Sequence, residues 1–280
     1  MMRICLLLTY LFSAAPESAL GSEHRVILSI DDGYRCIYDN VYPLLKKYKM
    51  TATIALIVDY VAGIKTGYGN PNTFLSYNQI KEMIDSTGIE IASHSLSHPY
   101  LTRLDSAQAW HEIYRSRTFL ESVFGVPVIT FVYPYGDRNP RVIRMVRRAG
   151  YRLGRAVKTG EINLWVEPYQ LPIFELRKET SLEAVKEHIK NNPVSILLLH
   201  RIVPQPAVFT EWSLENFAAL IEWLAANQIK TLTLADLYYE WREDVVKRMI
   251  QERTKTLPVF EPESLLQKIH IDATRTLNPR

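Results

Sequence analysis

Two adjacent carboxylates and a closely spaced pair of histidines are the residues with which this sequence could do chemistry. Asp31 and Asp32 directly follow the apolar run VILSI, and His94 and His98 belong to the segment SHSLSH. Two like charges side by side are costly unless a cation or a shared proton lies between them. The pattern therefore indicates a metal ion, and it points to the histidines as the other ligands.

The residue types define what such a site could do. Two imidazoles and one carboxylate form a three-ligand site suited to Zn²⁺ or a similar divalent ion, with one position left for water. His94, His98 and one of Asp31 and Asp32 would fill that role, and the other aspartate would be free to act as a base. His200, which follows the apolar run VSILLL, could protonate a leaving group. Because a metal lowers the pKa of bound water from about 15.7 to about 7, the set predicts metal-assisted hydrolysis.

Each motif alone has an ordinary structural explanation. Asp-Asp-Gly is frequent in turns, a His-x-x-x-His pair arises by chance in polar loops, and a lone histidine is often a satisfied core residue. The segment Tyr133-Pro134-Tyr135-Gly136 is by itself a turn. The chemical interpretation is favoured by their shared position after predicted strands, because the carboxyl ends of parallel strands collect reactive residues.

The elements that would position these residues alternate along the chain. Apolar runs rich in branched residues predict strands near 26–30, 51–58, 89–92, 128–132, 151–157, 170–176, 194–199 and 230–234. Helical spacing of apolar residues predicts helices over 38–48, 76–84, 106–124, 140–149, 181–191 and 213–227. This alternation predicts an α/β fold, a distorted (β/α) barrel with about seven to eight parallel strands.

Composition limits the classes of partner. The chain has 280 residues, a formal net charge of +3 and scattered charged residues, which gives no argument for binding nucleic acid or an anionic membrane surface. Cys5 and Cys36 are the two cysteines. Cys36 has no CxxC partner, so we expect a packed thiol and no disulfide in the mature chain. The sequence does not indicate an oligomeric state.

The two ends of the chain differ from the middle. Residues 1–21 have a short basic start, an apolar stretch and small residues before Ser22, which predicts a signal peptide cut after Gly21. The alternative is an uncleaved anchor. We therefore expect a secreted, periplasmic or cell-surface protein without a membrane span after cleavage. The predicted domains are a catalytic domain over 22–240 and a helical extension with a polar tail over 241–280.

Residues 26 to about 235 resemble the polysaccharide deacetylase family, also called the NodB-homology domain or carbohydrate esterase family 4. The stretches SIDDG, SHSLSH, VYPYG and LLLH resemble four of the family's motifs in the family's order. The resemblance implies a metal-dependent hydrolase that removes N-acetyl groups from a GlcNAc-containing polysaccharide through a metal-activated water. Its implied site is Asp31 as general base, His200 as general acid, the Tyr135 backbone amide at the oxyanion, and Asp32, His94 and His98 on the metal.

The sequence departs from the family pattern at two positions. The third motif often has an arginine where Val132 stands, and related members often have one where Ile173 stands. The group that orients Asp31 is therefore not named by the motifs, and Arg177 is a candidate by proximity alone. The Tyr-Pro-Tyr-Gly form, with the aromatic Tyr133, resembles deacetylases of poly-N-acetylglucosamine more than enzymes of chitin or peptidoglycan.

Two other functions fit the same residues. One is a glycan-binding module that has kept the fold without turnover, and the other is an O-acetyl polysaccharide esterase. If the protein is an enzyme, either the N-deacetylase or the esterase, Zn²⁺ is the expected metal, with Co²⁺, Ni²⁺ and Fe²⁺ as alternatives.

Overall fold

The computed structural model of the chain describes residues 24–61, 63, 70, 72–162 and 166–243. The predicted signal peptide and residues 244–280 of the predicted extension lie outside the described residues. The chain divides into two compact units, Met1–Leu237 and Tyr238–Arg280, and the fold described below is that of the first. In the part of the chain that the structure describes, no helix combines the length and apolar character needed to cross a bilayer.

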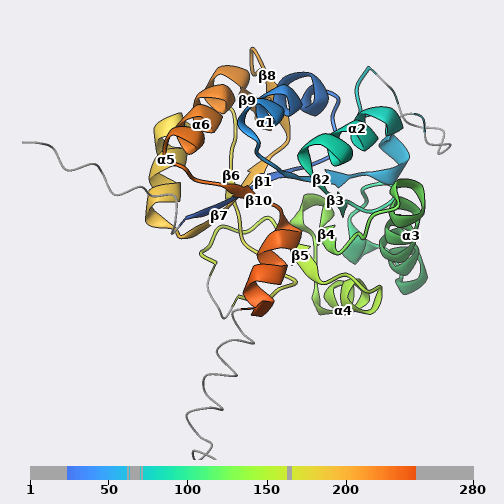
Figure 1. The fold of residues 1–280 in the computed structure, drawn as a ribbon. Helices are drawn as coiled ribbons and strands as arrows, with labels where there is room; N and C mark the ends of the chain where they lie inside the picture. The colour runs from blue at the N-terminus through green and yellow to red at the C-terminus, as the bar shows by residue number, and fades with distance from the viewer. Residues whose placement is uncertain (1–23, 62, 64–69, 71, 163–165, 244–280) are drawn as a thin grey trace, which may run out of the picture. The chain divides into compact units, whose positions relative to one another are not determined.

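An eight-stranded parallel sheet forms the centre of the fold (Figure 1). The strands are β1 (Arg25–Ile30), β2 (Thr53–Leu56), β3 (Glu90–Ser93), β4 (Thr130–Val132), β5 (Leu153–Arg155), β6 (Phe174–Glu175), β7 (Val194–Leu199) and β10 (Thr231–Leu232). Their order is β5-β4-β3-β2-β1-β7-β6, and β10 also pairs with β1. The parallel sheet predicted from alternating strands and helices is thus confirmed.

Strand β1 lies in the middle of this sheet and is paired along its whole length. One edge pairs with β7 from Arg25 to Ile30. The other edge is shared by β10, which pairs at Val26, and β2, which pairs at Ser29. A strand flanked on both edges and covered on both faces must be apolar, which explains the run VILSI. Its end therefore delivers Asp31 to the centre of the fold.

A single segment closes the ring of strands into a distorted barrel. Leu171 bridges to Arg155 of β5, and its backbone exchanges hydrogen bonds with Gly154 and Ala156. The same segment continues into β6, which pairs with β7 at Phe174. The barrel expected from the sequence is therefore confirmed, with a short and irregular wall between β5 and β7.

Helices connect the strands, and their ends follow local capping rules. They are α1 (Tyr42–Tyr48), α2 (Tyr77–Thr87), α3 (Ser106–Phe124), α4 (Pro140–Arg148), α5 (Leu182–Asn191) and α6 (Leu214–Ala226). Ser76 and Asp105 cap α2 and α3 in capping boxes with glutamine three residues later. The predicted helix over 38–48 begins as a π-turn, Ile37–Val41, before α1. Pro43 at the start of α1 lacks the N–H that a continuous α-helix would use there.

The two faces of the sheet have different side chains. Ile54, Leu56 and Ile91 belong to the large core, whereas Ala55, Ala92 and Val132 form a separate cluster. Successive strand residues point to opposite faces, so the small residues line the inside of the barrel. Small side chains there leave room for the polar groups at the carboxyl ends of the strands.

One pair of strands was not predicted. β8 (Arg201–Val203) and β9 (Glu211–Ser213) form a separate parallel pair directly after β7. The turn-rich segment between them, with two prolines, gave no strand signal.

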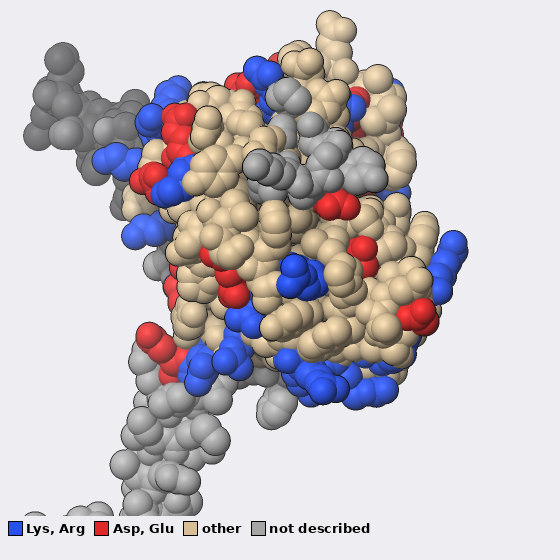
Figure 2. Space-filling view, turned by 90° about the vertical axis from the view of Figure 1, so that its right-hand side faces the viewer, with Lys and Arg blue, Asp and Glu red and all other residues tan. Residues whose placement is uncertain are grey.

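On the side of the molecule where α3 lies, acidic and basic side chains are interspersed, with Lys and Arg gathered near the lower edge (Figure 2). The scattered charge expected from the sequence holds for most of this face.

Candidate active site and metal centre

One cavity brings together every site residue that the sequence predicted. It has a volume of about 470 Å³, and its lining includes Asp31, Asp32, His94, His98, Tyr135 and His200. These residues come from the ends of β1, β3, β4 and β7. Because the strands are parallel, their carboxyl ends open at the same end of the barrel. The shared placement inferred from the sequence is therefore what the fold produces.

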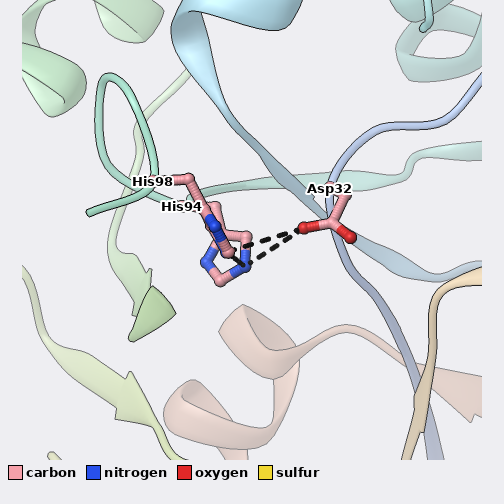
Figure 3. A group of neighbouring side chains, drawn as sticks. All are labelled: Asp32, His94 and His98. Atoms are coloured by element: carbon pink, nitrogen blue, oxygen red, sulfur yellow. Dashed lines mark hydrogen bonds and ion pairs between the residues drawn. The ribbon is translucent and has the colours of Figure 1, made fainter. Parts of the chain in front are cut away.

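Three of these side chains converge as metal ligands would (Figure 3). The Nε2 atoms of His94 and His98 are 3.0 Å apart. Oδ1 of Asp32 lies 3.5 Å from Nε2 of His94 and 3.7 Å from Nε2 of His98. One ligand atom from each residue lies within 4.8 Å of the other two. Two imidazole nitrogens and a carboxylate oxygen aimed at one point are a donor set that fits a divalent ion such as Zn²⁺.

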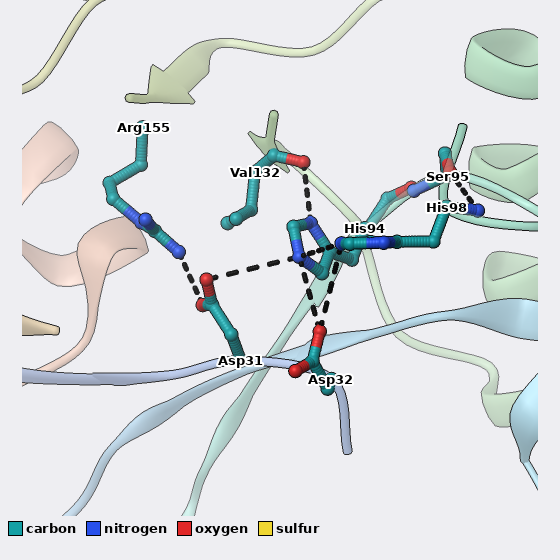
Figure 4. A network of polar contacts seen from close by, with 8 residues as sticks. Asp31, Asp32, His94, Ser95, His98, Val132 and Arg155 are labelled. Atoms are coloured by element: carbon teal, nitrogen blue, oxygen red, sulfur yellow. Dashed lines mark hydrogen bonds and ion pairs between the residues drawn. The ribbon is translucent and has the colours of Figure 1, made fainter. Parts of the chain in front are cut away.

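The backbone holds His94 in the tautomer that such a site needs. Nδ1 of His94 is 2.8 Å from the carbonyl oxygen of Val132. A carbonyl can only accept, so Nδ1 carries the proton and Nε2 presents its lone pair to the ligand cluster. Figure 4 shows this bond between the Val132 carbonyl and the His94 ring.

The electrostatics of the cluster keep its members in the forms that bind a cation. Burial together with the nearby His94 lowers the pKa of His98 to about 4, so this imidazole is neutral at pH 7. Burial raises the pKa of Asp32, but its interactions with His94, His200 and His98 lower it by more. The net pKa of Asp32 lies below its ordinary value, so its carboxylate is ionised.

The second histidine is positioned by the loop after β3. The carboxylate of Glu112, on α3, accepts hydrogen bonds from the N–H groups of Leu96 and Ser97 and from the Ser97 hydroxyl. The N–H of His98 donates to Oγ of Ser95 at 2.9 Å. The loop is therefore fixed by a hydrogen bond within it and by one carboxylate from a neighbouring helix.

Backbone strain is concentrated in the same motifs. Asp32, Ser95, His98 and Tyr135 have positive φ values of 70°, 68°, 63° and 58°. A left-handed conformation costs a non-glycine residue about 1–2 kcal/mol. The turns after β1, β3 and β4 thus all contain residues held in an unfavourable conformation, which is common where a fold aims side chains at a functional site.

The sequence did not identify the partner of Asp31. The guanidinium of Arg155, at the end of β5, forms a buried ion pair with the Asp31 carboxylate (Figure 4). Arg155 is the register partner of Val132 on the adjacent strand. It therefore points to the same side of the sheet as the position where the third motif often has arginine. Arg177, the candidate suggested by proximity, instead pairs with Glu175 at 2.7 Å.

His200 stands opposite this network at the end of β7. Its ring lines the cavity, and its charge contributes to lowering the pKa of Asp32. Nδ1 of His200 is buried and has no hydrogen-bond partner among the described residues. A backbone carbonyl thus fixes the tautomer of His94. Among the described residues, no hydrogen bond to Nδ1 fixes the tautomer of His200 in the same way.

Comparisons with known proteins identify relatives of this chain. Residues 20–154 match the family model described as polysaccharide deacetylase. The Bacillus subtilis protein YxkH, named as a polysaccharide deacetylase, is 33% identical over 139 residues, which cover 50% of this chain and 47% of that protein. The poly-β-1,6-N-acetyl-D-glucosamine N-deacetylase of Staphylococcus epidermidis is 28% identical over 179 residues, covering 61% of each chain. The chain thus spans about half to three fifths of these relatives.

Solved structures share the fold at lower identity. The peptidoglycan deacetylase PdaC of Bacillus subtilis has a TM-score of 0.56 and 18% identity, with 83% of this chain and 98% of that chain covered. A family 4 carbohydrate esterase from Bacillus anthracis has a TM-score of 0.54 and 21% identity, with 77% and 82% covered. Residues 20–154, which hold the aspartate and histidine motifs, belong to the polysaccharide deacetylase family.

Proposed function

We propose that the protein is a metal-dependent hydrolase that removes N-acetyl groups from a GlcNAc-containing polysaccharide. The observation that carries the proposal is the convergence of Asp32, His94 and His98 beside an arginine-paired Asp31. The similarity to a poly-β-1,6-N-acetyl-D-glucosamine N-deacetylase supports the choice of substrate. Export of the protein, predicted from residues 1–21, would bring it to such a polymer.

Asp32, His94 and His98 would hold the metal in this proposal, and Zn²⁺ is the ion we expect for two imidazoles and a carboxylate. Co²⁺, Ni²⁺ and Fe²⁺ accept similar donors. When bound, the ion would acidify a water molecule and polarise the acetyl carbonyl. The neutral His98 and the ionised Asp32 need no proton change to receive it near pH 7.

The proton transfers would fall to two residues that are not ligands. Asp31 would take the proton of the attacking water, and Arg155 would hold its carboxylate in place through the buried ion pair. His200, from β7, would give a proton to the amine that leaves. The backbone N–H of Tyr135, in the strained turn after β4, would donate to the oxyanion of the tetrahedral intermediate.

The test is acetate release by the full chain from N-acetylglucosamine oligomers, measured with Zn²⁺ and again with a chelator. Chelator-sensitive release is the expected result, and Asp31→Asn should retain the metal but release little acetate. Metal binding without release from any N-acetylated oligomer would refute the N-deacetylase. Release from an O-acetylated glycan would then favour the esterase, and glycan binding without release would favour the binding module.

A further inference from the structure

A phenylalanine stands at the rim of the cavity that holds the proposed metal site. Phe209 lies between β8 and β9, lines that cavity and is 64% exposed. A single exposed apolar side chain is ordinary on a protein surface. Phe209, however, lies in the wall of the cavity and is carried by a loop that is held in place.

The loop that carries Phe209 is fixed by hydrogen bonds and an ion pair. The buried carboxylate of Glu211 accepts hydrogen bonds from two backbone N–H groups of the loop, at 2.6 and 3.1 Å. Glu211 also pairs with Arg201 at 2.5 Å. The carbonyl of Phe209 accepts a hydrogen bond from the N–H of Lys178 at 3.0 Å. The ring is thus presented by an ordered loop, so a ligand that stacks on it pays little for ordering it.

Two charged residues accompany the ring. The guanidinium of Arg177 lies over the Phe209 ring at 5.4 Å from its centre, and Nη2 of Arg177 is 2.7 Å from Glu175. Both charged residues line the same cavity as Phe209. An aromatic ring beside a carboxylate and a guanidinium suits a pyranose, whose C–H face can stack while its hydroxyls hydrogen-bond to the charged groups.

The order of strands separates this group from the metal ligands. Asp32 and His98 follow β1 and β3, whereas Glu175 ends β6, at the far side of β7. His200, the proposed acid, follows β7 and so stands between the two groups. An acetamido group that is cleaved must lie between the metal ligands and His200. The Phe209 side of the cavity is then left for a different sugar residue of the same chain.

Resting on the proposed function, we propose that Phe209, Arg177 and Glu175 form a subsite for the sugar next to the one deacetylated. The ligand class is a neutral N-acetylhexosamine ring within an oligomer. A second sugar bound here makes the enzyme prefer oligomers to the monosaccharide, because the monosaccharide that occupies the metal site leaves the subsite empty.

The test compares Phe209→Ala with Val208→Ala, which removes the neighbouring exposed side chain of the same loop. Acetate release is measured from N-acetylglucosamine and from its pentasaccharide, and pentasaccharide binding to the chelator-treated full chain is measured by calorimetry. Phe209→Ala should lower kcat/KM for the pentasaccharide, and weaken its binding, by about tenfold, the value of one buried aromatic face. The monosaccharide rate should stay unchanged, as should both activities of Val208→Ala and of the ring-preserving Phe209→Tyr.

Three results would overturn the subsite. In the first, Phe209→Ala has the same kcat/KM for the pentasaccharide as Val208→Ala. In the second, Phe209→Ala lowers kcat/KM for the pentasaccharide and for the monosaccharide by the same factor. In the third, kcat/KM of Phe209→Tyr for the pentasaccharide is as low as that of Phe209→Ala. If the wild-type chain released no acetate at all, the proposed function would fail. The calorimetric comparison would then still decide whether Phe209 binds the oligomer.

Discussion

Replacing Arg155 by methionine tests whether the site depends on an arginine that comes from an unexpected strand. The side chain of Arg155 is 0% exposed and that of Asp31 is 4% exposed. Removing one partner of a buried ion pair costs roughly 3–5 kcal/mol because the other charge is left unpaired. Nε and Nη1 of Arg155 have no hydrogen-bond partner within the described residues, and methionine removes these two donors as well. We therefore expect Arg155→Met to lower the free energy of unfolding by an amount near the lower end of this range, about 3 kcal/mol.

The opposite truncation should be more costly. Asp31→Ala leaves the guanidinium buried without its carboxylate. We therefore expect the free energy of unfolding to fall by an amount near the upper end of the range, about 5 kcal/mol. The double variant should lose less than the sum, with a coupling of roughly 0.5–3 kcal/mol. Urea unfolding of the chelator-treated proteins measures all three values without a contribution from metal binding.

Activity should respond differently from metal content. A positioned base contributes about 10²- to 10⁴-fold, so Arg155→Met should lower kcat by a factor in that range. The metal should stay bound, because Arg155 forms its ion pair with Asp31, which is not one of the three proposed ligands. Guanidinium ion should partly restore kcat in Arg155→Ala, and so should Val132→Arg added to it, since residues 132 and 155 are register partners.

The reasoning would be refuted by either of two results. One is a kcat of Arg155→Met within threefold of the wild type. The other is strict additivity of the two stability losses, which would mean that the charges of Arg155 and Asp31 do not interact. Failure of both rescues with a well-folded Arg155→Ala would limit the arginine to a structural role.

Three further predictions concern the rest of the network. His94→Ala should lose both metal and activity, whereas His200→Ala should keep the metal and lose about 10²- to 10⁴-fold in kcat; equal metal retention in both would contradict the ligand assignment. Glu112→Ala should weaken metal affinity roughly 10- to 100-fold in a chelator competition, because Glu112 holds the His98 loop, while the exposed Glu187→Ala should not. Burial raises the pKa of Glu90, so its contribution to stability should be present at low pH and be lost as the pH rises above the ordinary carboxyl value. Urea unfolding of wild type and Glu90→Gln across pH would show this as a widening gap, and parallel curves would rule it out.

The sequence predicted the elements of this fold well because their signals are local. The capping serine at 76 and the left-handed Gly88 that ends α2 are read from a few neighbouring residues. The convergence of Asp32 with His98 was also predictable, because both follow apolar runs that must be parallel strands. Family motifs then suggested which aspartate faces the metal, an assignment that stays a prediction.

Arg155 could not be found in the same way. It lies in a strand of three residues, with Arg152 just before the strand, and the sequence does not say which arginine faces the barrel interior. That depends on the pairing of Arg155 with Val132, a contact between strands that no local pattern encodes. The β8–β9 pair was missed for a related reason, since each strand has only three residues.

The arginine stands at residue 155 in this chain and not at residue 132. Its position contrasts two kinds of site feature: those that need only a group at the right place in space, and those that need a particular local stretch of chain. Arg155 reaches Asp31 from β5, and we expect that an arginine at residue 132 of β4 would reach it too, because register partners point to the same face. The proposed metal ligands have no such freedom. His98 depends on a left-handed residue, a serine hydroxyl and the carboxylate of Glu112 within one loop, so moving it would require rebuilding that loop. We therefore expect relatives of this chain to vary in the origin of the arginine and to keep the SHSLSH spacing.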